Sequence, residues 1–239
     1  MTVVMGSINV VSGLLVYGLL GNSSVVSLTT SSYGMSLTSF LVSGIAFAPV
    51  ITSGLGLFTS FLYPSQLETV MTTTTGFRKY LMLNSVLPIS INLGSSTVSF
   101  VAGVFLFGLN FSYNIFAFAL VIMLGVATAL ALGLVGAAFQ LVFKQTAVLS
   151  WFLFAFTGIA GNMLVPSQVL PGSVQVVSYL LPQYYFFTGI RVALGSDAAP
   201  LVSILLPFGL YAILLNVCGF VAVSRSLVHL RQTGTYSWS

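Results

Sequence analysis

Few side chains in this 239-residue chain can do chemistry, and they are widely separated. Besides six Lys and Arg residues and ten tyrosines, the ionisable or metal-binding groups are Glu68, Asp197, His229 and Cys218. A metal site needs such residues in a cluster, and acid–base catalysis needs them within reach of one substrate. No lysine follows the glycine pattern of a phosphate-binding loop. We therefore expect this chain to be no enzyme and to hold no metal or cofactor of its own.

The composition indicates that most of the chain lies in a bilayer. Charged residues make up 3% of the chain and hydrophobic residues 57%, whereas a soluble domain is about one-quarter charged. A helix that crosses a hydrocarbon core about 30 Å thick needs about 20 mostly apolar residues. About six such runs occur, at residues 3–21, 38–62, 81–107, 114–139, 147–165 and 201–224. These runs are too long for barrel strands. The expected fold is an all-α bundle of about six transmembrane helices, forming one domain over residues 1–239.

The basic residues predict the orientation of this bundle. With six spans, five of the six cations share one side of the membrane: Arg78, Lys79, Lys144, Arg225 and Arg231. The positive-inside rule makes that side cytoplasmic. Because the number of spans is even, both termini are expected there, in a multi-pass protein of the cell membrane. The cations are too scattered to predict a nucleic-acid-binding surface.

The segment 166–200 is expected on the outer side. It contains four prolines and a run of aromatic residues, so it is too broken to span the membrane. The stretches 174–181 and 184–194 are short enough for re-entrant or interfacial helices. Tyrosines suit the headgroup level of a membrane, so we expect Tyr184, Tyr185 and Arg191 at the external rim. There Asp197 or a lipid phosphate would pair with Arg191.

A short helix is predicted in the cytoplasmic segment 64–80. Ser65 and Glu68 have the spacing of a capping box, and Gly76 offers a left-handed stop. Leu67, Val70 and Met71 share one face of this helix. Either it lies on the membrane surface or it docks a cytoplasmic partner. None of the charged residues lies in the middle of a span, so an ion-driven relay is not expected. Any active transport would then take its energy from another polypeptide.

Small residues recur every four positions along the fourth run, at Gly125, Ala129, Gly133 and Ala137. Such a ridge lets a second helix approach closely. We interpret it as a contact surface within the subunit or between subunits.

Two segments resemble motifs of the type-2 permease subunits of ATP-binding-cassette exporters, and the resemblance covers nearly the whole chain. After their second span these permeases carry a Gly-Thr-Leu-Glu-x-Leu-Leu-x-Thr-Pro-like motif. This chain matches it at Leu67, Glu68, Val70, Met71 and Thr73, but lacks the Gly, the first Thr and the Pro. Before the last span, the order Leu170-Pro171, Pro182, the aromatic run 184–187 and Arg191 is similar to the second motif.

The resemblance implies the membrane subunit of an exporter. Two permease chains, as a homodimer or a heterodimer, would pair with a separate ATPase that holds ATP and magnesium. The implied ATPase-coupling residues are Ser65, Leu67, Glu68, Val70, Met71 and Thr73. The implied candidates for the substrate pathway are Phe47, Phe58, Phe154, Phe156, Thr157 and Asn162. Membrane lipids are the other expected partners. The alternative is a passive pore, or a scaffold that anchors a membrane complex, and neither needs an ATPase.

Overall fold

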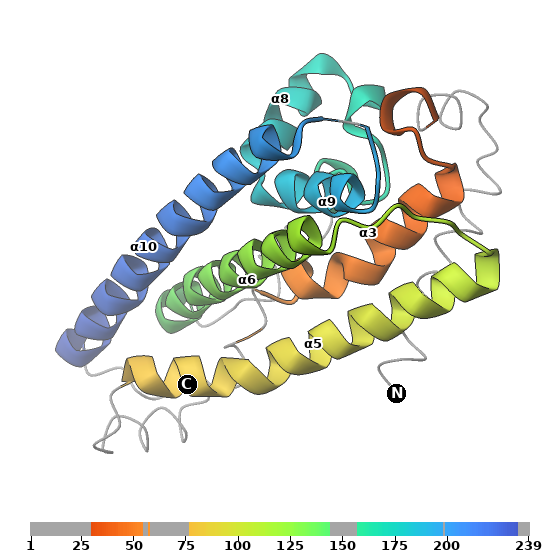
Figure 1. Cartoon of the computed structure of the whole chain (residues 1–239). Coiled ribbons are helices and arrows are strands. Elements are labelled where there is room, and N and C mark those ends of the chain that lie inside the picture. The colour runs from red at the N-terminus through yellow and green to blue at the C-terminus, as the bar shows by residue number, and fades with distance from the viewer. Residues whose placement is uncertain (1–29, 55–56, 58–76, 144–156, 198, 234–239) are drawn as a thin grey trace.

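The computed structural model describes residues 30–54, 57, 77–143, 157–197 and 199–233, and every regular element within them is a helix (Figure 1). In chain order these are α3 (Leu37–Thr52), α5 (Phe77–Phe107), α6 (Ile115–Phe143), the 3-10 turn η3 (Ser167–Val169), α8 (Gly172–Leu180), α9 (Pro182–Ala193) and α10 (Leu201–Thr233).

Three of these helices are long and apolar enough to cross a membrane. The apolar stretches are Met82–Phe107 in α5, Ile115–Phe143 in α6 and Leu201–His229 in α10. They coincide with the third, fourth and sixth runs predicted from the sequence. The chain is therefore all-helical in its described part and has the helices of a membrane protein. The first predicted run lies outside the described residues, as does most of the fifth.

Helix α3 is shorter than the run predicted at 38–62. It begins at the N-cap Ser36, whose hydroxyl accepts the Ser39 N–H at 3.2 Å, and ends at Thr52 after 16 residues. At its end the hydroxyls of Thr52 and Ser53 donate to the carbonyls of Ala48 and Pro49, at 2.8 and 2.5 Å. Side-chain hydroxyls that bond to nearby backbone carbonyls compete with helix continuation. An apolar run thus continues in sequence past the point where the helix ends.

The loops and short helices gather at one end of the long helices (Figure 1). The Asn114 N–H donates to the Ala193 carbonyl at 2.9 Å, and the Ser196 hydroxyl donates to the Tyr33 carbonyl at 2.8 Å. These bonds join the start of α6, the end of α9 and the segment before α3. The start of α5 and the end of α10 lie at the other end of the long helices (Figure 1). These segments contain Lys79 and Arg225. We call the end that holds α8 and α9 the capped end.

The small-residue ridge of α6 is buried within the chain. Gly125, Ala129, Gly133 and Ala137 are all buried. A methyl group at Gly125 would overlap the ring of Phe186 from α9, and one at Gly54 would lie 2.7 Å from the Ala129 carbonyl oxygen. The ridge therefore lets α9 and the end of α3 approach α6 closely, which settles its use as a contact within the subunit.

Candidate functional site

Arg191, near the end of α9, is the largest fully buried side chain of the described residues, with 0% of its surface exposed. Its Nη1 donates to the Asn162 carbonyl at 2.6 Å, and its Nη2 donates to the carbonyls of Met163 at 2.9 Å and Phe40 at 3.2 Å. The guanidinium carbon lies 3.5 Å from the centre of the Phe40 ring, within cation–π range. One side chain thus ties together α3, the turn at 162–163 and α9.

The expectation that a lipid phosphate pairs with Arg191 at the external rim is wrong. A rim cation must be reachable from water or headgroups, and this side chain is fully buried. Asp197, the other expected partner, is exposed. The guanidinium binds backbone carbonyls and not a phosphate. The turn at 162–163 is not helical, so its carbonyls are free to accept hydrogen bonds from a side chain. The sequence analysis placed residues 162–163 inside the predicted span 147–165, where a helix would have used these carbonyls.

Asn162 is the second centre of this buried polar network. It has a φ of 60° and is the single described non-glycine residue with a positive φ, a conformation that asparagine tolerates better than most residues. Its Nδ2 donates to the Thr188 hydroxyl at 2.9 Å. Its Oδ1 accepts from the Tyr33 hydroxyl at 3.1 Å and from the Ser167 N–H at 3.2 Å. The turn is held by its own side chain as well as by Arg191.

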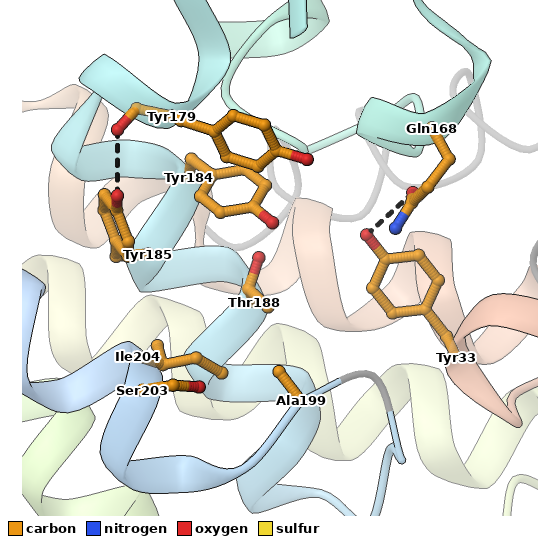
Figure 2. Close-up of a pocket in the computed structure, with 9 residues that line it drawn as sticks. All are labelled: Tyr33, Gln168, Tyr179, Tyr184, Tyr185, Thr188, Ala199, Ser203 and Ile204. Carbon is orange, nitrogen blue, oxygen red and sulfur yellow. Dashed lines mark hydrogen bonds between the residues drawn. The ribbon is translucent and has the colours of Figure 1, made fainter. Parts of the chain in front are cut away.

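Next to this network lies a pocket of about 210 Å³, which we call the tyrosine pocket (Figure 2). Its lining residues come from the segment before α3, from η3, α8 and α9, and from the start of α10. They are Tyr33, Gln168, Tyr179, Tyr184, Tyr185, Thr188, Ala199, Ser203 and Ile204. Tyr184 and Tyr185, expected at the external rim, are both half-buried in its wall.

The tyrosine rings hold one another at right angles. The Tyr184 ring centre lies 5.0 Å from that of Tyr179 and 5.3 Å from that of Tyr185, with interplanar angles of 88° and 87°. These are favourable edge-to-face arrangements. The Tyr185 hydroxyl donates to the Tyr179 carbonyl at 2.9 Å, which fixes the end of α8 against α9. The pocket wall is therefore built from mutually supporting rings.

Tyr184 is held in its neutral form. Burial, with smaller contributions from the phenols of Tyr33 and Tyr179, raises the pKa of Tyr184 to about 12. The hydroxyls of Ser167 and Thr188 act in the opposite direction. Because the pKa lies far above neutral pH, this phenol keeps its proton and can donate as well as accept a hydrogen bond.

Of the six residues expected along a substrate pathway, three are described by the structure, and all three are buried. Phe47 is 3% exposed and lies in the core, with ring centres 5.2 Å from Phe100 and 5.4 Å from Phe118. Thr157 and Asn162 are buried at the capped end. Phe58, Phe154 and Phe156 lie outside the described residues, as do all six coupling residues, Ser65, Leu67, Glu68, Val70, Met71 and Thr73.

Sequence reasoning missed Tyr33, Phe40, Gln168 and Thr188, which form the polar network and the pocket. Tyr33 and Gln168 are joined by a hydrogen bond of 3.2 Å across 135 positions of the chain, and no local pattern predicts such a pair. Within the described ranges, no three His, Cys, Asp or Glu side chains come together as metal ligands. The site can hold a ligand through rings, hydroxyls and amides.

Comparison of this chain with protein-family models, with curated proteins and with solved structures found no match.

Proposed function

We propose that this chain is the membrane-spanning permease subunit of an ATP-binding-cassette exporter, which moves a substrate across the membrane with energy from a separate ATPase. The observation that supports this most is the pair of short helices at the capped end. Helices α8 and α9 come directly before the long apolar helix α10 in the chain, and α9 packs between α6 and α10. This is the order that the resemblance to type-2 permeases implies.

The charges of the described helices also support a subunit that takes its energy from a partner protein. In α5 and α10, Lys79 and Arg225 stand near the helix ends, and no described Asp or Glu lies in the three apolar stretches. Proton- and ion-coupled transporters normally place ionisable groups inside the membrane. Without such groups, the work of moving a substrate has to come from a partner protein.

The proposed assembly has six spans per permease chain, with both termini and the segment 65–75 on the cytoplasmic side. Two permease chains, alike or different, pair with the ATPase, which holds ATP and magnesium. The segment 65–75 forms a short helix that seats on the ATPase. Leu67, Val70 and Met71 supply its apolar face, and Glu68 caps the helix and offers a carboxylate to the partner.

Affinity purification from the native membrane tests the proposal. The tagged chain should bring down a protein with a phosphate-binding loop, and Leu67→Asp should remove that protein because it puts a charge on the docking face. Thr69→Asp is the matched control: it adds the same charge two positions away, off the face that Leu67 shares with Val70 and Met71. Both variants should insert into the membrane normally.

Recovery of the chain without any ATPase would overturn the proposal and favour a passive pore or a scaffold. If Leu67→Asp and Thr69→Asp both recover the ATPase as well as the unmodified chain does, the exporter proposal still holds. That result would show that the ATPase does not dock on the segment 65–75.

A further inference from the structure

The polar groups of the tyrosine pocket converge on its centre. Figure 2 shows the hydroxyls of Tyr179, Tyr184 and Thr188 and the side-chain amide of Gln168 pointing into the space between α8, α9 and Tyr33. Some of their bonding capacity is already used. The Tyr33 hydroxyl has one proton, which it shares between Asn162 Oδ1 at 3.1 Å and Gln168 Oε1 at 3.2 Å. The Thr188 hydroxyl accepts from Asn162 at 2.9 Å. The hydroxyls of Thr188 and Ser167 also bond to the Tyr184 phenol and lower its pKa. The proton of Tyr184 and the lone pairs of the Tyr33 hydroxyl remain for a ligand.

The lining indicates the charge of the ligand. None of the nine described lining residues is charged. Arg191 does not line the pocket, and both of its terminal nitrogens donate to backbone carbonyls. An anion would therefore have no cation to bind in the pocket. A cation would find no carboxylate in the lining, and the Arg191 guanidinium carbon lies only 5.9 Å from the Tyr33 ring centre, where like charges repel. The pocket suits a neutral ligand.

The hydroxyls indicate the polarity of the ligand. A tyrosine or threonine hydroxyl both donates and accepts, and its best complement is a group that does the same. A quaternary ammonium group, the usual ligand of a cage of aromatic rings, has neither a donor nor an acceptor. It would leave the proton of the half-buried Tyr184 hydroxyl without an acceptor, and an unsatisfied buried polar group costs about 1–3 kcal/mol. A ligand with several hydroxyls avoids this loss.

Size narrows the ligand to one ring. A cavity of about 150 Å³ accommodates a benzene molecule, so a pocket of about 210 Å³ has room for a six-membered ring with small substituents. The orthogonal tyrosine rings offer apolar faces for the C–H side of such a ring, while their hydroxyls reach its edge.

From these observations we infer that the tyrosine pocket binds one neutral sugar ring, either free or as the headgroup of a membrane glycolipid. Ser203 and Gln168 are exposed at its edge, so a ring can enter from the medium or from the headgroup layer. Binding by the pocket needs no ATPase, so this inference stands or falls separately from the exporter proposal.

The test uses the full chain in lipid nanodiscs and two probes. One is monoglucosyl diacylglycerol within the nanodisc, and the other is free methyl β-glucoside in solution. Tyr179→Phe removes one hydroxyl and should weaken binding about 2- to 10-fold, which corresponds to one lost hydrogen bond. Tyr179→Ala also removes the ring and should weaken binding by more than about 10-fold.

Tyr113 provides the matched control. It is 58% exposed at the capped end, it follows α5, and it does not line the pocket. Tyr113→Phe and Tyr113→Ala should leave the affinity unchanged. Tyr179 is 44% exposed and its ring can be removed without opening the core, so a folded Tyr179→Ala protein is expected, and circular dichroism checks this.

If both probes bind with the Tyr179 dependence, the ring alone is recognised. If only the glucolipid does, the ligand is a lipid headgroup; both results support the inference. If neither probe binds, the inference is overturned. Binding of phosphatidylcholine that competes with the sugar and is unaffected by Tyr179→Phe would also overturn it, because that result would identify a cage for a quaternary ammonium group.

Discussion

Replacement of Arg191 by methionine tests whether the buried guanidinium holds the capped end together. The change removes the donors that the carbonyls of Asn162 and Met163 have in this structure. The Phe40 carbonyl keeps a hydrogen bond from the Ser43 hydroxyl at 2.9 Å, so two carbonyls lose their side-chain donor. Each buried acceptor left unsatisfied costs about 1–3 kcal/mol. We therefore expect the free energy of unfolding to fall by about 2–6 kcal/mol.

Two further variants separate hydrogen bonding from charge. Arg191→Lys keeps the charge but loses the planar fork that reaches several acceptors at once, so its loss should be smaller than that of Arg191→Met. Arg225→Met removes a charge from an exposed position on α10 and should change the stability by no more than about 0.5 kcal/mol. Equilibrium unfolding in mixed micelles, with a rising fraction of SDS and circular dichroism as the readout, measures all three variants.

The reasoning fails if Arg191→Met is as stable as Arg225→Met. Burial of a charge carries a large desolvation cost, and replacement of buried ionic groups by apolar ones can stabilise a protein. Equal or higher stability would mean that desolvation of the guanidinium outweighs its three hydrogen bonds, and that the fold at this end depends on apolar contacts alone.

Three other changes give independent checks by the same unfolding measurement. A methyl group at Gly44 would overlap the Met163 carbonyl, whereas one at Gly94 meets nothing within 4 Å; Gly44→Ala should lose about 1–3 kcal/mol and Gly94→Ala should gain about 0.5–1 kcal/mol. Asn162→Ala should destabilise more than Asn162→Gly, by about 1–2 kcal/mol, because only alanine is strained at a φ of 60°. The folded pKa of Tyr184, about 12, lies above its unfolded value of 10.0. The unfolded chain therefore releases this proton first, stability should fall as pH rises above 10, and Tyr184→Phe should reduce that fall.

Different results would contradict each of these expectations. Equal losses for Gly44→Ala and Gly94→Ala would mean that α3 does not lie against the turn at 162–163. Equal stabilities of the two Asn162 variants would mean that this residue has an ordinary backbone conformation. If stability falls equally above pH 10 in Tyr184→Phe and in the unmodified protein, the fall does not arise from the Tyr184 phenol.

The long helices were predictable because hydropathy is a local property. Each of α5, α6 and α10 corresponds to one continuous apolar run, and about 20 such residues suffice to identify a candidate span. The short helices α8 and α9 were predictable for a similar reason, since Pro171 and Pro182 stand directly before or at their first residues. The end of α3 was not, because it depends on hydroxyls that bond back to the chain and on a close approach to α6.

The polar network was beyond local reasoning because its bonds join distant parts of the chain. Arg191 and Phe40 are 151 positions apart, and Tyr33 and Asn162 are 129 apart. A single cation in an aromatic segment near a membrane surface is most simply interpreted as a rim residue. That interpretation lacked the turn at 162–163, whose carbonyls accept from the guanidinium in place of water or a phosphate.

This replacement of solvent by backbone carbonyls has a mechanical consequence. A guanidinium bound to water leaves its helix free to move, whereas here the Arg191 bonds join α9 to α3 and to the turn at 162–163. Thr188 lies one turn before Arg191 on the same helix. Its hydroxyl accepts a hydrogen bond from Asn162, and its side chain lines the tyrosine pocket. Movement of α9 away from α3 would have to break these bonds together and would change the pocket in the same step. In the proposed exporter, the capped end would therefore shift as one unit when an ATPase tilts the spans, and a ring bound in the pocket would move with it.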